Sequence, residues 1–305
     1  MLSSLGTILL DNILPAFAVI AVGVFADRGL RADKDTLSRL AIYVLSPCLV
    51  FDSIASSAVN GDQFARLVAH LLLVTLAMVA LSMLLARILG WSSRQSDALV
   101  LSTAFLNTGN LGLSVVLLAF GTVGLQYATV FFVVSNFMSY TIGAVFAARG
   151  TDGKFGWGAV GRAMRLPGAY AFLLAMLVRW TSVMVPPVLA KPVGLLGQAS
   201  VPVMLVLLGM QLSQTKVTVR LGQVSVGVVL RLVVGALVGV AIAPLVGLVG
   251  LPRSVAIVQA AMPTAVTSAL LAITFDADAE YVTSVVFTTT LLSAVTLSLL
   301  LVALI

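Results

Sequence analysis

The sequence predicts an all-α polytopic membrane protein with ten transmembrane helices. Of its 305 residues, 60% are hydrophobic and 9% are charged, whereas soluble domains carry about 25% charged residues. Apolar runs of about 20 residues, the length that crosses a hydrocarbon core of about 30 Å, recur along the whole chain. Together these observations exclude an ordinary soluble enzyme.

Ten apolar runs, each bounded by charges or turn residues, are the expected spans. The first run contains Asp11 and no basic segment precedes it, so we expect it to be a span and not a cleaved signal peptide. The longest polar stretch, near 149–165, is Gly-rich and basic, which divides the chain into 1–150, a linker at 151–165, and 166–305. The expected spans are 5–26, 36–58, 63–89, 96–120, 123–148, 166–185, 192–213, 219–249, 254–275 and 281–304.

The charged residues predict orientation. The chain carries 17 Lys and Arg against 11 Asp and Glu, and the bases lie in short loops, so we expect no nucleic-acid binding. Twelve bases fall in the odd loops and four in the even ones, which places the odd loops in the cytoplasm and both termini outside. The acidic loop 276–280 is an exception, because it holds no base. With one cysteine and one histidine, no disulfide, metal site or cofactor is expected.

The two halves of the chain look like copies of one unit. Leu14-Pro15-Ala16 recurs as Leu166-Pro167-Gly168, and Gln126-Tyr127-Ala128-Thr129 recurs as Glu280-Tyr281-Val282-Thr283, at offsets of 152 and 154 residues. Five spans per copy is an odd number, so the second copy enters the membrane from the opposite side. Inverted repeats of this kind are typical of secondary transporters, whose binding site lies near the midplane on discontinuous helices.

Both copies contain an expected helix break. Span 4 holds Asn107-Thr108-Gly109-Asn110-Leu111-Gly112, and the matching place in span 9 is 261–268, where Pro263 lacks an N–H. A half-helix that begins at either break presents free N–H groups, which suit a carboxylate. Two alternatives stay open: the glycines only allow close packing, or the proline only kinks the helix. The predicted substrate-binding residues are Asn107, Gly109, Asn110, Gly112, Pro263, Thr264 and Thr267.

Three ionisable residues inside spans are candidates for coupling or gating, because burying such groups in a membrane is costly. Arg231 is the deepest, and it attracts the anion, pairs with an acid, or snorkels. Asp52 is either a coupling carboxylate or a hydrated vestibule residue. His70 is either a proton switch or a hydrogen-bonded residue at the membrane interface.

At these residues the chain resembles the auxin efflux carrier family, which includes bacterial malonate-carrier-like proteins. The resemblance rests on 45–51, 107–112 and 261–265 and covers essentially all ten spans. It implies a fold similar to sodium/bile-acid symporters, with a scaffold of spans 1, 2, 6 and 7, a transport domain of spans 3–5 and 8–10, and broken spans 4 and 9 that cross. It further implies an organic anion at the crossing, contacted by Asn107, and a homodimer. Leu106 and Ser114 replace two prolines usual in the family, so the break in span 4 is expected to rest on glycine alone.

The predicted function is secondary transport of a small organic anion, malonate-like or auxin-like, by alternating access. The expected partners are this anion and the lipid bilayer, and the expected location is a bacterial inner membrane. An anion channel or a ligand sensor on the same scaffold is the alternative. An enzyme is not expected, because the sequence has neither a membrane-depth Ser–His pair nor a G-x-x-x-x-G-K-[ST] loop.

Overall fold

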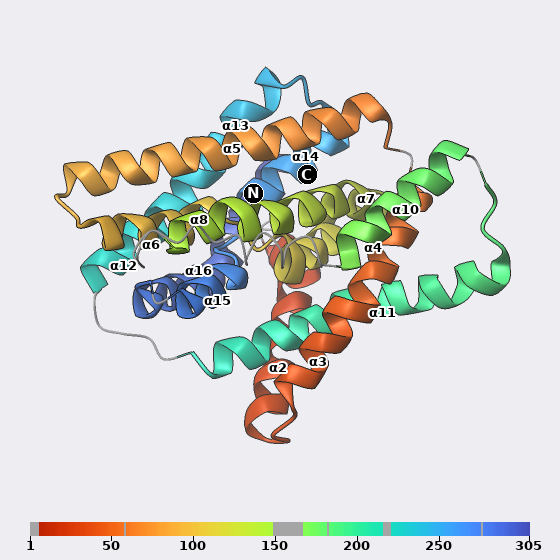
Figure 1. Cartoon of the computed structure of the whole chain (residues 1–305), viewed down its shortest axis with the longest axis horizontal. Coiled ribbons are helices and arrows are strands. Elements are labelled where there is room, and N and C mark those ends of the chain that lie inside the picture. Colours follow the sequence, from red (N-terminus) through yellow and green to blue (C-terminus); the bar gives the residue numbers. More distant parts are fainter. Residues whose placement is uncertain (1–5, 58, 149–166, 182, 216–220, 276) are drawn as a thin grey trace.

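The structure is a computed structural model that describes residues 6–57, 59–148, 167–181, 183–215, 221–275 and 277–305. The regular elements in these ranges are α-helices and short π-helical turns, labelled α and η (Figure 1). The first half contains η1 Leu9–Ile13, α2 Leu14–Arg28, α3 Lys34–Leu40, η2 Ala41–Leu45, α4 Ser46–Ala55, α5 Gly61–Ile88, α6 Ser93–Ala104, η3 Thr108–Leu113, α7 Ser114–Met138, η4 Ser139–Gly143 and α8 Ala144–Ala148. The second half contains α10 Pro167–Thr181, α11 Pro187–Ser213, α12 Leu221–Val229, η5 Leu230–Val234, α13 Gly235–Leu245, α14 Gly250–Ala260, α15 Val266–Thr274 and α16 Ala279–Leu304.

Seven helical stretches in the described residues are long and apolar enough to cross a membrane, which makes this a polytopic membrane protein. Three of the ten expected spans are not among them. The expected spans 96–120 and 254–275 are each divided by a short non-helical segment, and 166–185 is represented by α10, which has 15 residues. The linker expected at 151–165 lies outside the described residues. The seven helices are Gly6–Arg28, Lys34–Ala55, Gly61–Ile88, Thr108–Ala148, Pro187–Ser213, Leu221–Leu245 and Ala279–Leu304.

Local chemistry sets several helix boundaries. Asn60 begins α5 with a capping box: its side chain accepts from the Gln63 N–H at 2.8 Å, and the Gln63 side chain accepts from the Asn60 N–H at 3.2 Å. Ser92 begins α6 in the same way. Gly121 interrupts α7 with φ +66° and ψ −164°, a backbone conformation that L side chains rarely adopt. The chain therefore turns at Gly121, where the expected spans 4 and 5 meet.

Two glycines let α2 and α11 pack with their backbones in contact. The helices run alongside each other in Figure 1. A Cβ atom on Gly209 of α11 would lie 2.9 Å from the Gly23 Cα of α2, and a Cβ on Gly23 would lie 2.9 Å from the Val206 carbonyl carbon. Small residues at a crossing allow this approach in membranes, where dispersion contacts replace the hydrophobic effect between helices.

We predict that Gly209→Ala destabilises the protein by about 1–3 kcal/mol, because the added methyl group forces α2 and α11 apart. Thermal unfolding in detergent, followed by tryptophan fluorescence, measures the change. Gly61→Ala is the matched control, since no atom lies within 4 Å of the added Cβ. Equal unfolding temperatures for the two variants would contradict the close contact.

Candidate functional site

The two non-helical segments cross and pair through their backbones. The segment between α6 and η3 meets the segment between α14 and α15, where Leu106 and Thr264 form an antiparallel bridge. The Asn107 N–H donates to the Pro263 carbonyl at 2.9 Å, and the Ala265 N–H donates to the Phe105 carbonyl at 3.0 Å. Because unpaired backbone groups are costly inside a membrane, each break supplies the partner that the other one needs.

The break in the first segment comes earlier than the sequence predicts. Phe105 already has extended backbone angles, φ −106° and ψ 132°, so the helix ends before the glycines of 107–112. The expectation that this break rests on glycine alone is wrong, because hydrogen bonds to the Pro263 segment hold Phe105 and Asn107 in place. The glycines serve packing as well: a Cβ on Gly109 would lie 2.7 Å from the Phe132 ring.

Both half-helices that leave the crossing begin without a side-chain cap. Asn107 precedes η3, which continues into α7, and Ala265 precedes α15; neither start has a side-chain hydrogen bond to its first N–H groups. The first N–H groups of a helix have no partner within the helix, and they carry the positive end of its dipole. The geometry is suited to an anion held between the two starts.

A cavity of 770 Å³ reaches this crossing, within the size range of small-molecule sites. Asn110 and Thr267, from the first turns of the two half-helices, are part of its lining. Its far end is lined by residues next to the odd loops, among them Lys34, Gln214 and Glu280. The remaining lining comes from α15, α11 and α16, from α3 and η2, and from Phe132, Asn136 and Tyr140 of α7 and η4.

The other predicted binding residues lie around the crossing without lining this cavity. Asn107 is buried, and its Nδ2 has no hydrogen-bond partner among the described residues. Thr264 is fully buried and its hydroxyl donates to the Ser102 carbonyl at 2.5 Å, so this side chain holds the fold together and is not open to a ligand. Pro263 contributes its carbonyl to the crossing. Gly112 packs against the Asn107 carbonyl, where a Cβ would lie 3.1 Å away.

Gln259 is a site residue that the sequence analysis missed. It is fully buried in α14, two residues before the break, and neither its Nε2 nor its Oε1 has a partner in the described part of the chain. Its side chain lies beside Gly112. A buried amide with both polar atoms unsatisfied is costly, which marks it as a functional candidate. The available signal was a lone amide in the apolar run before Pro263.

Arg231 lies behind the crossing and not in the cavity. Its side chain is fully buried; Nη1 donates to the Thr103 carbonyl at 2.5 Å and Nη2 donates to the Ala260 carbonyl. Thr103 and Ala260 belong to the last turns of α6 and α14. The guanidinium therefore does not snorkel, and within the described residues its partners are carbonyls and not a carboxylate.

His70 and Asp52 lie apart from the predicted binding residues. The His70 Nε2 is 2.9 Å from the Gly239 carbonyl, and the ring packs edge-on against Phe131. This face of α5 is fully buried, so His70 is a hydrogen-bonded residue inside the helix packing. Asp52 is half-buried on α4 and faces Gly194 of α11, where a Cβ would lie 3.7 Å from its Oδ1. Neither residue lines the 770 Å³ cavity.

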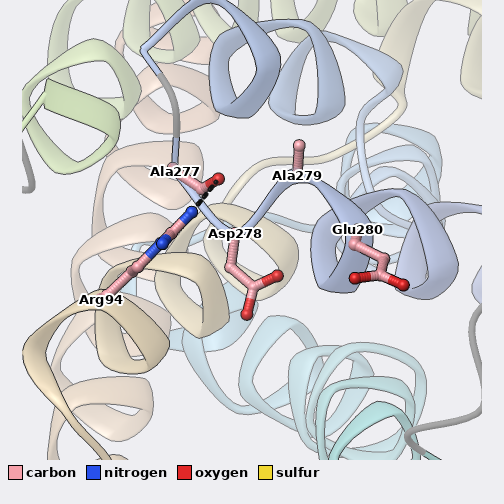
Figure 2. A pocket seen from close by; sticks show the side chains of 5 residues that line it. All are labelled: Arg94, Ala277, Asp278, Ala279 and Glu280. Carbon is pink, nitrogen blue, oxygen red and sulfur yellow. Dashed lines mark hydrogen bonds between the residues drawn. The ribbon is translucent and has the colours of Figure 1, made fainter.

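A second hollow, of 460 Å³, lies beside the acidic loop (Figure 2). Arg94, from the start of α6, donates to the Ala277 carbonyl at 3.2 Å, and the Asp278 and Glu280 carboxylates complete the lining. The contact brings the loop before α6 next to the loop before α16. Glu280 also lines the 770 Å³ cavity, so the two hollows adjoin.

Comparisons with known proteins match this chain to membrane transport proteins. The profile of a family described as "Membrane transport protein" matches residues 8–156 and 159–301. An uncharacterized transporter of Methanothermobacter thermautotrophicus is 29% identical over 300 residues, which cover 98% of this chain and 95% of the relative. An uncharacterized transporter of Methanocaldococcus jannaschii is 25% identical over 298 residues, 95% of this chain and 97% of the relative.

We predict that Gly112→Ala destabilises the protein by about 1–3 kcal/mol, because the new Cβ meets the Asn107 carbonyl and the Gln259 side chain at the crossing. The unfolding temperature in detergent measures the effect. Gly168→Ala, which has no atom within 4 Å of its new Cβ, is expected to leave this temperature within error of the parent. A neutral Gly112→Ala would show that the crossing is looser than the structure has it.

Proposed function

The chain belongs to the membrane transport protein family, which includes the auxin efflux carriers, and we propose that it is a secondary transporter of a small organic anion that works by alternating access. The observation that carries the proposal is the backbone-paired crossing, from which two uncapped half-helices start beside a cavity. Asn110 and Thr267 line this cavity and would add neutral donors to a carboxylate. The Asn107 Nδ2 and both polar atoms of the Gln259 amide, which have no partner within the described ranges, would complete the site when the crossing rearranges.

We further propose the ten-span inverted repeat and its division into two bodies. The packing supports a scaffold, because α11 contacts both α2 and α4 extensively and α4 in turn contacts α10. It also supports a transport domain, because α5, α6, α7 and α12 to α16 form a second set of mutual contacts that includes the crossing. Movement of the second set against the first would expose the crossing to alternate sides of the membrane.

The structure fits an inward-facing state under the predicted orientation. The cavity runs from the crossing to residues bordering the odd loops, which the distribution of Lys and Arg places in the cytoplasm. In this arrangement both termini are outside and the protein lies in the cytoplasmic membrane. A homodimer stays a prediction of the family resemblance, which light scattering on the purified protein would test.

The substrate class is testable with solid-supported-membrane electrophysiology on proteoliposomes. Malonate, other dicarboxylates and aromatic carboxylates are applied by concentration jump. We expect a saturable transient current with one class, lost in Asn107→Ala, because the Asn107 Nδ2 has no hydrogen-bond partner among the described residues while its backbone N–H maintains the crossing. Gln198→Ala, which removes an exposed amide on α11 that does not line the cavity, is the control and keeps the current.

Counterflow of a radiolabelled ligand separates a carrier from a channel or a sensor. A carrier accelerates uptake of label when unlabelled ligand is inside the vesicle, because the loaded site returns faster. A flux that rises linearly with the external ligand concentration and does not depend on the concentration of unlabelled ligand inside the vesicle would indicate a channel. Ligand-dependent thermal stabilisation without any flux would assign a sensor.

A further inference from the structure

Arg231 is a buried charge that the proposed transport step does not use. Its guanidinium is always ionised, is fully buried, and does not line the cavity. Keeping such a charge inside a membrane protein is costly unless it is compensated. Its partners are the Thr103 and Ala260 carbonyls, so the compensation comes from backbone dipoles.

The two carbonyls end the two helices that enter the crossing. The α6 helix has 12 residues and α14 has 11, and each carries about half a negative charge at its carboxyl end. Together the two ends carry about one negative charge, which one guanidinium balances. Without Arg231, the negative potential of both carboxyl ends would oppose the positive potential at the first N–H groups of η3 and α15, which begin at the same crossing.

The surrounding chain is shaped to hold the guanidinium in this position. Gly235, one turn further along the same helix, leaves the space that it occupies; a Cβ there would lie 2.7 Å from the Arg231 Cζ. Gly235 and Gly239 form a G-x-x-x-G stripe on this helix. Gly239 packs against Ala260, and its carbonyl accepts the hydrogen bond from His70. Both glycines of this G-x-x-x-G stripe thus serve contacts inside the chain.

We propose that Arg231 sets the anion selectivity of the crossing. It neutralises the carboxyl ends of α6 and α14, so the amino ends of η3 and α15 govern the potential at Asn110 and Thr267. Arg231 is a positioning residue that acts through the two helix ends and does not touch the ligand. The inference rests on the proposed function only in assigning this potential a role in selecting the transported anion. The positive potential at Asn110 and Thr267 can itself be measured without a substrate.

Charged thiol reagents measure this potential directly. In a Cys48→Ser background, which removes the chain's one cysteine, Thr267→Cys places a thiol on the cavity lining beside the crossing. The rates of modification by an anionic and a cationic methanethiosulfonate are compared, with a neutral one to correct for access. We expect the anionic-to-cationic ratio to exceed that of free cysteine by about tenfold or more.

Replacing the arginine separates charge from structure. Arg231→Met is expected to lower the ratio at Thr267→Cys by about tenfold, whereas Arg231→Lys keeps the charge and most of the ratio. Ser38→Cys, which lines the same cavity near the odd loops, is the matched control and keeps its ratio in Arg231→Met. Arg231→Gln, which retains an N–H donor without charge, serves if the methionine variant does not fold.

Two results would overturn the proposal: a ratio at Thr267→Cys no higher than that of free cysteine, or an unchanged ratio in a folded Arg231→Met protein. Malonate currents recorded on the same proteoliposomes keep the two proposals apart. If the parent protein shows the expected thiol ratios but no carboxylate moves or binds, the transport proposal fails and the role of Arg231 stands. If carboxylates move with unchanged selectivity in Arg231→Met, the role of Arg231 fails alone.

Discussion

The hydrogen bonds between two interrupted helices are the constraint on which the rest of the structure depends. A helix that stops inside a membrane leaves N–H and C=O groups without partners, and lipid cannot supply them. Here Asn107 donates to Pro263 and Ala265 donates to Phe105, so two costly breaks become one paired crossing. The half-helices, the close packing of Gly112 and the placement of Gln259 all follow from keeping these two segments together.

The pairing of the two interrupted helices also decides where the positive and negative ends of the helix dipoles lie at the crossing. Two helices end there and two begin, so negative and positive dipole ends meet within a few residues of each other. Arg231 donates hydrogen bonds to the Thr103 and Ala260 carbonyls, at the negative ends of α6 and α14. In the same region the Thr264 hydroxyl donates to the Ser102 carbonyl. The ends that face the cavity are left to Asn110 and Thr267. A site of this kind needs no charged side chain in contact with the ligand.

The sequence predicted those parts of the site that depend on local chemistry. Glycines and a proline inside apolar runs indicated where two helices would be interrupted, and seven helices of membrane length are present in the described residues. Features set by tertiary contacts could not be predicted from the sequence. The carbonyl partners of Arg231 lie 128 and 29 residues away, the burial of His70 depends on α13, and the start of the first break depends on a segment of the other half of the chain.

The two hydrogen bonds that pair the broken segments join main-chain atoms, and these are the same in every amino acid except for the missing N–H of proline. The side chains of Phe105 and Leu106 take no part in these two hydrogen bonds, but both are buried, so a substitution there preserves the pairing only if it fills the same space. The backbone pairing at the crossing can therefore be kept while side chains that line the cavity, such as Asn110 and Thr267, are replaced, so the same fold can acquire a different substrate specificity.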